Sequence, residues 1–323
     1  MPRPRILLTR RWPAEVQHYL AARYEVTLNE QDVPPGPEEL RVALRSHDAV
    51  CPTVTDRMGA EILQAGAGRV KIIGNYGVGV SHIDLEACKR FGIAVTNTPD
   101  VLTEPTADIA LTLMLMAARG AGAGDREIRN HAWPGWGPMR NLGAEVSGRT
   151  LGLIGLGRIG QATARKAHRG FGMRILYFSR HRAPQEIEAE TRAVHCASLD
   201  ELLAAADFVS LHCPGGVQNR HLIDARRLAQ MKKTAFLINT ARGEVVDEQA
   251  LAQALRSGTI AGAGLDVYEH EPRVADELLP LENVVLLPHL GSATLETRTA
   301  MGMRVATNLD SFFAGAAPPD RVV

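Results

Sequence analysis

The sequence predicts an α/β protein made of two doubly wound parallel-sheet domains. Three observations lead to this fold class. The chain has 323 residues, which is more than a single hydrophobic core usually holds. Short apolar segments alternate with helical segments through the first hundred residues, and a second series of the same kind begins at Thr150. Strands that alternate with helices are typical of parallel sheets with crossover connections.

The first series has the lengths and composition of buried strands separated by helices. We expect strands at 5–9, 24–28, 48–53, 70–75 and 94–96, and helices at 14–22 and 38–45. A proline-rich loop at 34–37 precedes the second of these helices. The order of the elements predicts a parallel sheet.

The second series contains six apolar segments of strand length. They lie at 150–154, 174–178, 208–211, 235–238, 264–267 and 284–287. Six strands in sequence are what a doubly wound dinucleotide-binding domain requires. A last helix is expected at 295–313, where apolar residues recur near helical spacing. It either extends the second domain or returns to the first.

Charge and composition exclude several classes of protein. Lysine and arginine total 36, as do aspartate and glutamate, so we expect no nucleic-acid and no membrane partner. The chain has no run of about 18 apolar residues that would suggest a membrane span. Its four cysteines show no Cys-x-x-Cys spacing, which favours reduced thiols in a cytoplasmic protein over a disulfide or a metal site.

A glycine-rich loop follows the strand at 150–154 and opens a helix at 158–169. It consists of Gly155, Leu156, Gly157, Arg158, Ile159 and Gly160, in the pattern Gly-x-Gly-x-x-Gly. Such glycines allow a tight turn, close approach of the backbone to a pyrophosphate, and tight packing of helix on strand. The helix N-terminus then faces the phosphate charge. A glycine-rich turn without a ligand is the alternative, but the flanking strand and helix favour a dinucleotide.

The loop after the strand at 174–178 indicates which dinucleotide binds. NAD sites usually place an acidic residue there for the ribose hydroxyls. This chain has Ser179, Arg180 and Arg182 instead, and no acid before Glu186. A hydroxyl and guanidinium groups suit a 2′-phosphate. The loop favours NADP(H) over NAD(H), and a solvated basic loop is the alternative.

Three residues in the last third suggest one chemistry: Arg242, Glu271 and His289. A planar guanidinium is suited to bind a carboxylate. An imidazole titrates near neutral pH and can donate a proton while a cofactor moves a hydride. A carboxylate on the other ring nitrogen selects the tautomer and favours the protonated ring. The alternatives are a surface arginine and a structural histidine, but both residues directly follow apolar strands.

Several short segments of the sequence resemble the motifs of a known protein family. They are Asn75–Gly79, Thr98–Thr103, Asn239–Gly243, Gly264–Val267 and Gly291–Thr294. With the glycine-rich loop, they make the chain similar to the D-isomer-specific 2-hydroxyacid dehydrogenases, and among these to the glyoxylate/hydroxypyruvate reductases. The resemblance covers nearly the whole chain. It implies reduction of a small 2-oxoacid to the 2-hydroxyacid with NADPH, with Glu271 and His289 relaying the proton.

The resemblance also implies how the domains are divided. Residues 1–99 and 292–323 would form a flavodoxin-like substrate-binding domain, and residues 100–291 a Rossmann cofactor domain. The ligands would bind in a cleft between the two domains. Residues 100–147 would carry a dimerisation segment.

By the same resemblance, the backbone N–H groups of Val78 and Gly79 would hold the substrate carboxylate opposite Arg242. The residues implied to line the cofactor are Val101, Cys213, Pro214, Asn219, Thr240, Ala241, Asp266, His289 and Gly291. Asp266 would accept a hydrogen bond from the nicotinamide amide. Many relatives carry threonine where Asn219 stands, so this contact departs from the family pattern.

Trp133 and Trp136 lie in a glycine- and proline-rich segment at 131–143. Tryptophans in a loop usually mark burial against another surface. In similar reductases this stretch lies at a dimer interface, which implies a homodimer in which Trp136 reaches the partner's substrate pocket. Ordinary packing within the chain is the alternative.

Two functional alternatives stay open. One is another D-2-hydroxyacid dehydrogenase, acting on 2-ketogluconate, D-lactate or phosphoglycerate. A formate dehydrogenase would carry glutamine in place of Glu271 and does not fit. The other alternative is a nucleotide-sensing binding protein on the same fold, such as the transcriptional corepressors that resemble these enzymes.

Overall fold

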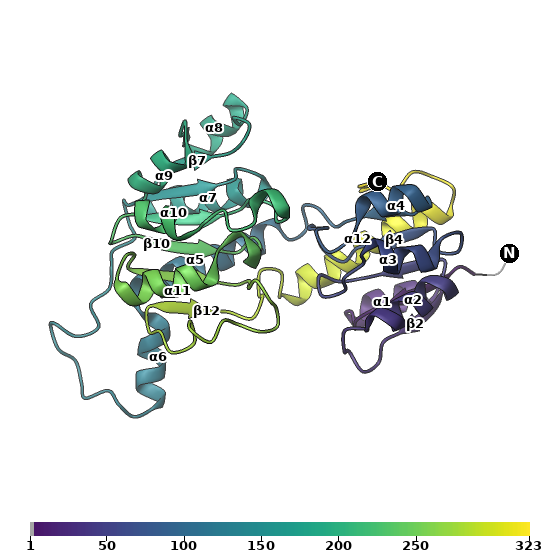
Figure 1. The fold of residues 1–323 in the computed structure, drawn as a ribbon, viewed down its shortest axis with the longest axis horizontal. Helices are drawn as coiled ribbons and strands as arrows, with labels where there is room; N and C mark the ends of the chain where they lie inside the picture. The colour runs from purple at the N-terminus through teal and green to yellow at the C-terminus, as the bar shows by residue number, and fades with distance from the viewer. Residues whose placement is uncertain (1–2) are drawn as a thin grey trace. The chain divides into compact units, whose positions relative to one another are not determined.

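The computed structural model describes residues 3–323, and the chain forms two compact units (Figure 1). One unit consists of the chain up to Leu102 together with Ala293–Val323, and the other of Thr103–Ser292. The chain passes between the units twice, after Leu102 and after Ser292. Each unit has its own sheet and its own hydrophobic core.

The first unit is a five-stranded parallel sheet in the order β2-β1-β3-β4-β5. Its strands are β1 (Arg5–Leu8), β2 (Glu25–Leu28), β3 (Ala49–Cys51), β4 (Ile72–Gly74) and β5 (Ala94–Thr96). Its helices are α1 (Ala14–Ala21), α2 (Pro37–Ser46), α3 (Ala60–Leu63), η1 (Gln64–Gly66), α4 (Leu85–Phe91) and α12 (Leu295–Phe313). This is the strand order of flavodoxin-like sheets, so the predicted fold class is confirmed for this unit.

Helix α12 packs on the first unit and does not extend the second. An added Cβ at Gly74 of β4 would lie 2.8 Å from Val305 Cγ1, and one at Gly302 would lie 2.7 Å from Val16 Cγ1. Val305 is fully buried at this contact. Glycine therefore lets β4 and α1 approach α12 closely at these two positions.

The second unit is a seven-stranded parallel sheet in the order β12-β11-β10-β9-β6-β7-β8. Its strands are β6 (Thr150–Ile154), β7 (Arg174–Phe178), β8 (Ala193–His195), β9 (Phe208–Leu211), β10 (Phe236–Asn239), β11 (Gly262–Leu265) and β12 (Val284–Leu286). Its helices are α5 (Thr103–Arg119), α6 (Ala121–Arg129), α7 (Arg158–Phe171), α8 (Gln185–Thr191), α9 (Leu199–Ala205), η2 (Val217–Asn219), α10 (Ala225–Gln230), η3 (Gly243–Val245) and α11 (Glu248–Ser257). The predicted doubly wound class is confirmed here as well.

Strand β8 is the strand of this sheet that the sequence analysis did not predict. It has three residues and pairs only with β7, at the edge of the sheet. Val194 in its centre is 58% exposed. Strands buried on both faces read as continuous apolar runs, whereas this short edge strand does not.

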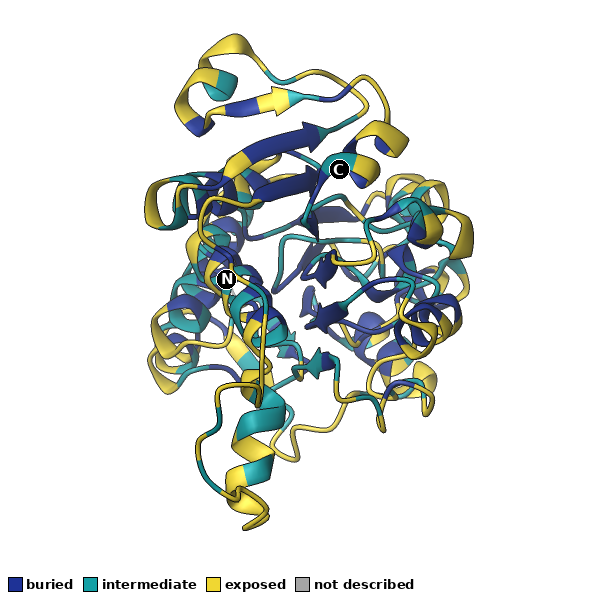
Figure 2. Cartoon of the chain, turned by 90° about the vertical axis from the view of Figure 1, so that its left-hand side faces the viewer, coloured by how far each residue is buried: buried dark blue, intermediate teal, exposed yellow. Residues whose placement is uncertain are grey.

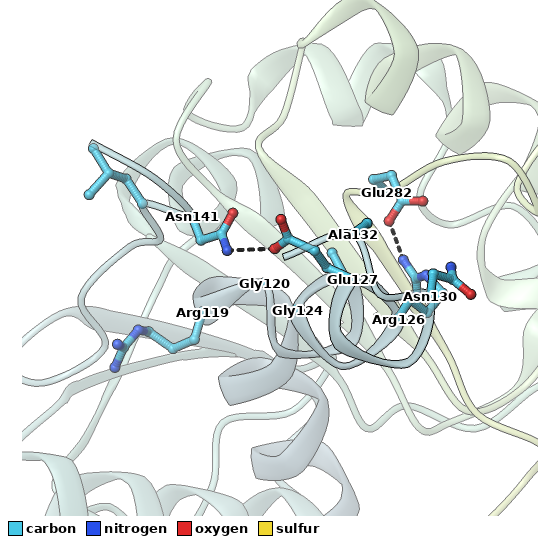
Figure 3. A pocket seen from close by; sticks show the side chains of 11 residues that line it. Arg119, Gly120, Gly124, Arg126, Glu127, Asn130, Ala132, Asn141 and Glu282 are labelled. Atoms are coloured by element: carbon cyan, nitrogen blue, oxygen red, sulfur yellow. Dashed lines mark hydrogen bonds and ion pairs between the residues drawn. The ribbon is translucent and has the colours of Figure 1, made fainter. Parts of the chain in front are cut away.

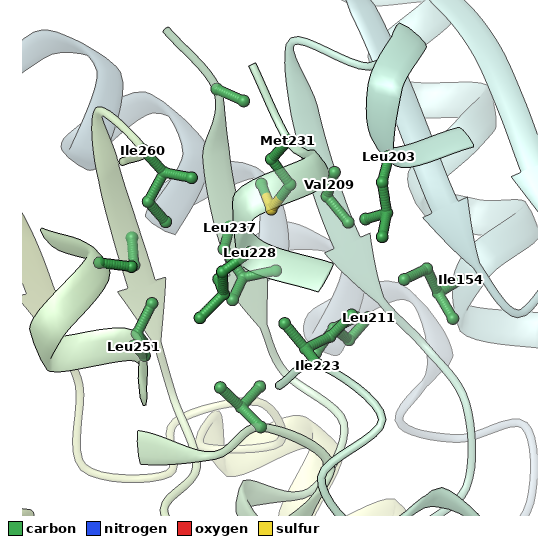
Figure 4. Close-up of a cluster of buried hydrophobic side chains, with 14 of the residues drawn as sticks. Ile154, Leu203, Val209, Leu211, Ile223, Leu228, Met231, Leu237, Leu251 and Ile260 are labelled. Carbon is green, nitrogen blue, oxygen red and sulfur yellow. The ribbon is translucent and has the colours of Figure 1, made fainter. Parts of the chain in front are cut away.

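The strands lie in the interior, and helices cover them. Figure 2 shows most strands in dark blue and the outer turns of the helices in yellow. In the second unit, Ile154, Val209 and Leu237 of three neighbouring strands belong to one buried cluster with Leu251 of α11 (Figure 4). Burial of such a side chain contributes roughly 1.5–3 kcal/mol to stability, so this core holds the strand ends and their loops in place.

The strand order reverses on either side of β6. The chain leads from β6 to β7 on one side and later returns to β9 on the other. The loops that follow β7 and β9 therefore turn away from each other at the carboxyl ends of the strands, on either side of β6. Ligands of doubly wound sheets bind at such a point, and the glycine-rich loop, which follows β6, lies there.

Across residues 3–323, no helix is both long and apolar enough to cross a membrane. The same residues contain no cluster of three or more His, Cys, Asp and Glu side chains arranged to hold a metal ion.

Candidate active site

The glycine-rich loop after β6 leaves open space at its middle glycine. Gly155 has a φ of 97°, which few other residues tolerate, and an added Cβ there would lie 2.9 Å from the carbonyl carbon of His212. An added Cβ at Gly160 would lie 2.4 Å from Gly155 O, whereas one at Gly157 would meet nothing within 4 Å. The first and third glycines are thus required by packing within the chain. The second leaves room at the start of α7, as a pyrophosphate requires.

The loop after β7 gives its two arginines different partners. Arg182 donates from Nε and Nη2 to the two carboxylate oxygens of Glu188, at 2.8 and 2.9 Å. Hydrogen bonds from Arg182 and from Tyr177 Oη lower the pKa of Glu188 to about 2, so this carboxylate stays charged. Arg180 Nη1 instead donates to Gln218 Oε1 at 2.5 Å. Arg182 is therefore engaged within the chain, and Arg180 is the better candidate for a 2′-phosphate.

A side chain of the loop after β9, residues 213–219, holds the two ends of this loop together. Asn219 Nδ2 donates to Pro214 O at 2.8 Å. Asn219, predicted to line the cofactor, thus shapes this loop. Burial raises the pKa of the Cys213 thiol to about 11, so the thiol is neutral and unreactive at physiological pH.

Asn239, the last residue of β10, arranges the loop that carries Arg242. Its Oδ1 accepts from Ala241 N and its Nδ2 donates to Arg242 O, both at 3.0 Å. The buried Thr240 Oγ1 has no hydrogen-bond partner among the described residues, which fits a polar ligand group beside it. The sequence analysis did not select Asn239, although asparagine commonly bonds to the backbone two residues further on.

The Arg242 guanidinium makes no ion pair with any carboxylate of residues 3–323. Its Nη1 donates only to Ala241 O, at 2.6 Å. Burial lowers the pKa of Arg242, and the negative charges of Glu271 and Glu244 oppose this effect. A partly desolvated cation without a bonded anion is suited to receive an anionic ligand.

Gly243 allows the segment that carries Glu271 to approach Arg242. An added Cβ at Gly243 would lie 1.8 Å from Tyr268 C and 2.3 Å from Glu269 N. The backbone after β11 therefore runs directly over Gly243, and a larger residue would displace it. This contact joins positions that lie far apart in the sequence.

His289 and Glu271 form a hydrogen-bonded pair. His289 Nδ1 lies 3.0 Å from Glu271 Oε2, with the two side chains 32% and 28% exposed. Burial acts to raise the pKa of Glu271, but the bond and charge of His289, the N–H of Tyr268 and the charge of Arg242 hold the pKa below its usual value. Glu271 is therefore ionised near neutral pH. His289 Nε2 has no partner among the described residues and is open to a ligand.

Asp266 holds the backbone that carries His289. Its carboxylate oxygens accept from Leu290 N at 2.6 Å and from Gly291 N at 2.8 Å. His289 has a φ of 55°, which is uncommon for a residue other than glycine, so these bonds support an unfavourable conformation. The sequence predicts that Asp266 bonds the nicotinamide amide. Both of its oxygens also accept from the His289 loop, a contact that only tertiary structure creates, and the bond to the nicotinamide amide stays a prediction.

In the first unit, the turn Gly77–Gly79 offers two N–H groups. Asn75 Nδ2 donates to Gly77 O at 2.8 Å and to Gly79 O at 3.1 Å, and Asn97 Nδ2 donates to Val78 O at 2.9 Å. The N–H groups of Val78 and Gly79 have no acceptor among the described residues. Successive free N–H groups suit an anion. The sequence analysis missed the two asparagines that shape this turn.

The remaining predicted residues have the following places. In the glycine-rich loop, Leu156 is buried, and Arg158 and Ile159 begin α7. After β7, Ser179 Oγ donates to His181 O at 2.6 Å, and near the end of the second unit Gly291 O accepts from Thr106 Oγ1 at 3.1 Å. Val101 is half-buried in the first unit.

Residues 111–291 match a known domain family, described as D-isomer specific 2-hydroxyacid dehydrogenase, NAD binding domain. The match covers more than half of the chain, and it spans all the residues from the glycine-rich loop to Gly291. The chain belongs to this family. It is therefore an oxidoreductase, and its second unit is a nicotinamide-dinucleotide-binding domain.

Full-length relatives extend the similarity to both units. A glyoxylate reductase of Thermococcus onnurineus is 47% identical over 324 residues, which cover 99% of this chain and 96% of the relative. The crystal structure of a glyoxylate reductase from Paecilomyes thermophila is 35% identical, with a TM-score of 0.87 over 100% of this chain and 99% of that one. An NADPH-dependent glyoxylate/hydroxypyruvate reductase from Sinorhizobium meliloti, solved with NADP and malonate, is 34% identical, with a TM-score of 0.88 over 99% and 97%.

The tryptophan segment of this 2-hydroxyacid dehydrogenase is exposed in the single chain. Trp133 is 50% exposed and Trp136 is 84% exposed, and Met139 and Leu142 beside them are also exposed. Packing of Trp136 within the chain, the alternative considered above, does not occur. The apolar side chains of this segment are thus available to another surface.

The end of this segment is tied to α6. Asn141 Nδ2 donates to Glu127 Oε2 at 2.8 Å, and Arg140 donates to the other oxygen of Glu127. A pocket next to α6 is bordered by Glu127, Asn141 and the ion pair between Arg126 and Glu282 (Figure 3). No residue predicted to bind cofactor or substrate lines this pocket.

Proposed function

We propose that this dehydrogenase reduces a small 2-oxoacid, glyoxylate or hydroxypyruvate, to the 2-hydroxyacid with NADPH. The observation that carries the proposal is the hydrogen-bonded pair of His289 and Glu271, which leaves Nε2 of His289 free of any partner among residues 3–323. The same unit holds the Arg242 guanidinium, which makes no ion pair with a carboxylate of these residues. The substrate class is supported by the relatives named glyoxylate reductase, one of them 47% identical.

The residues of the chain would divide the work as follows. The dinucleotide, when bound, supplies the hydride to the carbonyl carbon. Arg242 binds the substrate carboxylate. His289 Nε2 donates the proton to the carbonyl oxygen. Glu271 accepts from Nδ1–H, which keeps the ring oriented and stabilises its protonated form.

The features of the second unit fit a dinucleotide with a 2′-phosphate. The open space at Gly157 and the N-terminus of α7 would hold the pyrophosphate. Ser179 and Arg180 would bind the 2′-phosphate, because no acidic side chain occupies this loop. The unpartnered hydroxyl of Thr240, with Ala241, would line the nicotinamide end.

A spectrophotometric panel tests the proposed function. Glyoxylate, hydroxypyruvate, pyruvate and 2-ketogluconate are each assayed with NADPH and with NADH. We expect the highest kcat/KM for glyoxylate or hydroxypyruvate with NADPH. Higher values for pyruvate or 2-ketogluconate would assign the protein to another activity of the family.

The Arg180→Ala variant should raise the KM for NADPH about 10-fold or more, because a charge-assisted hydrogen bond contributes about 1.5–3 kcal/mol. The KM for NADH should hardly change. Arg182→Ala is the matched control, since Arg182 is bonded to Glu188 and should matter less. An equal rise of KM for both cofactors in Arg180→Ala would show that Arg180 does not bind the 2′-phosphate.

We also propose a homodimer in which the segment 131–143 contacts the partner and Trp136 borders the partner's substrate pocket. The support is the exposure of Trp136, at 84%, next to other exposed apolar side chains. A rigid aromatic wall would limit the size of the pocket and favour small 2-oxoacids.

Trp136→Ala should therefore change the relative kcat/KM values across the substrate panel more than it changes the KM for NADPH. Light scattering on the native protein should give twice the mass of one chain. An active monomer at assay concentration would exclude the dimer. A dimer whose Trp136→Ala variant keeps native kcat/KM values would exclude only the contribution to the pocket.

A further inference from the structure

Glu244 lies between the loop after β9, which the family resemblance implies to line the cofactor, and Arg242, which is proposed to bind the substrate. Its Oε1 accepts from Gly216 N, in the loop after β9, at 2.5 Å. An added Cβ at Gly215 would lie 2.5 Å from Glu244 Oε1 and 2.9 Å from Arg242 Cγ. The loop after β9 therefore packs directly against both the Glu244 carboxylate and the Arg242 side chain.

Backbone hydrogen bonds join the same two segments. His221 N donates to Glu244 O at 2.8 Å, and Ile223 N donates to Val245 O at 3.0 Å. They fix the backbone of Glu244, so its side chain reaches Gly216 from a defined position. Glu244 makes no ion pair among residues 3–323, and its charge acts on Arg242, where it opposes the lowering of the pKa that burial causes.

We infer that Glu244 is a positioning residue that couples cofactor binding to substrate binding. The inference rests on the proposed function, in which Arg242 binds the substrate carboxylate, and on the family resemblance, which implies that Cys213 and Pro214 of the loop after β9 line the cofactor. A dinucleotide in contact with Pro214 would further restrict this loop, which is already held by the bonds of Asn219 and Glu244. The Glu244 carboxylate, bonded to Gly216, then restricts where the neighbouring guanidinium can lie. The second ligand binds to a site that is already ordered, so each ligand should tighten the binding of the other.

A binding experiment on the full-length protein tests this coupling. The Kd for NADPH is measured by its fluorescence with and without oxamate, an unreactive carboxylate similar in shape to glyoxylate. In the native protein, oxamate should lower the Kd for NADPH about 5-fold or more. In Glu244→Ala this shift should disappear, and the KM for glyoxylate should rise while kcat stays within about twofold. Glu244→Gln should keep the shift, because its amide oxygen can still accept from Gly216 N.

Two further variants make the experiment decisive. Gly215→Ala should also abolish the shift, because its Cβ would displace the Glu244 carboxylate and the adjacent Arg242 side chain. Glu277→Ala removes an exposed carboxylate elsewhere in the unit and should behave as the native protein does. A native-sized shift in Glu244→Ala, or a lost shift in Glu244→Gln, would overturn the inference. Intact coupling in a protein that does not turn over glyoxylate would count against the proposed function alone.

Discussion

Replacing His289 by alanine should lower kcat for glyoxylate reduction by roughly 100-fold or more and leave the Kd for NADPH nearly unchanged. The ring is the proposed proton donor. It is bonded to Glu271 at 3.0 Å, and Asp266 holds the backbone beside it. Alanine removes the donor and leaves Arg242 and the cofactor-binding loops in place. Steady-state kinetics and a fluorescence titration with NADPH measure the two effects separately.

Glu271→Gln is the companion variant, and its effect should depend on pH. The pKa of Glu271 is held below its usual value, so the carboxylate is charged throughout the neutral range and favours the protonated ring there. Reduction requires that protonated ring. Glutamine carries no charge to stabilise a protonated ring, so the alkaline limb of the pH profile for reduction should move to lower pH. Near-normal turnover in His289→Ala would exclude the assigned role, and an unmoved limb in Glu271→Gln would exclude the pairing.

Replacing Arg242 by glutamine should lower kcat/KM for glyoxylate by about 30-fold to several-thousand-fold, since loss of one partner of a desolvated charge pair costs about 2–5 kcal/mol. Among residues 3–323 the guanidinium has no carboxylate partner, so the substrate would supply it. Arg242→Lys should recover only part of the loss, because an ammonium group cannot bind a carboxylate through two parallel bonds.

Methylglyoxal, a neutral oxoaldehyde without a carboxylate, is the control substrate for Arg242. Its slow reduction should be nearly equal in the native protein and in Arg242→Gln. Equal losses for glyoxylate and methylglyoxal would mean that Arg242 supports the fold and does not bind the carboxylate. Thermal unfolding of each variant separates the two cases further.

Most of the predicted strands are buried on both faces, although the exposed edge strand β2 was predicted as well. Every residue of β6 and β9 is buried, and the two runs are predominantly apolar because each strand is covered on both sides. Strand β8 escaped prediction because Val194 faces solvent at the sheet edge. The glycine-rich loop could also be predicted, because the spacing of its glycines is typical of a local turn. Which of its glycines leaves room for a ligand depended on His212, which comes from another strand end.

The partners of polar side chains were the least predictable feature of the site. Arg180 and Arg182 are equivalent in the sequence, yet Arg182 bonds to Glu188 and Arg180 to Gln218. Asp266 is predicted to bond the cofactor, and nothing in the sequence indicated that its two oxygens also accept from the loop after His289. A hydrogen bond depends on distance and direction, and neither is encoded in a short motif.

The sequence by itself determined the two parallel sheets, the glycine-rich loop and the chemical identity of Arg242, Glu271 and His289. These follow from local patterns: apolar runs, glycine spacing and the types of residue that end a strand. Only the tertiary structure decided how these residues are arranged. The approach of Tyr268 to Gly243 and the bond from Gly216 to Glu244 join segments that are distant in the chain, so they exist only once the sheet has brought its loops together.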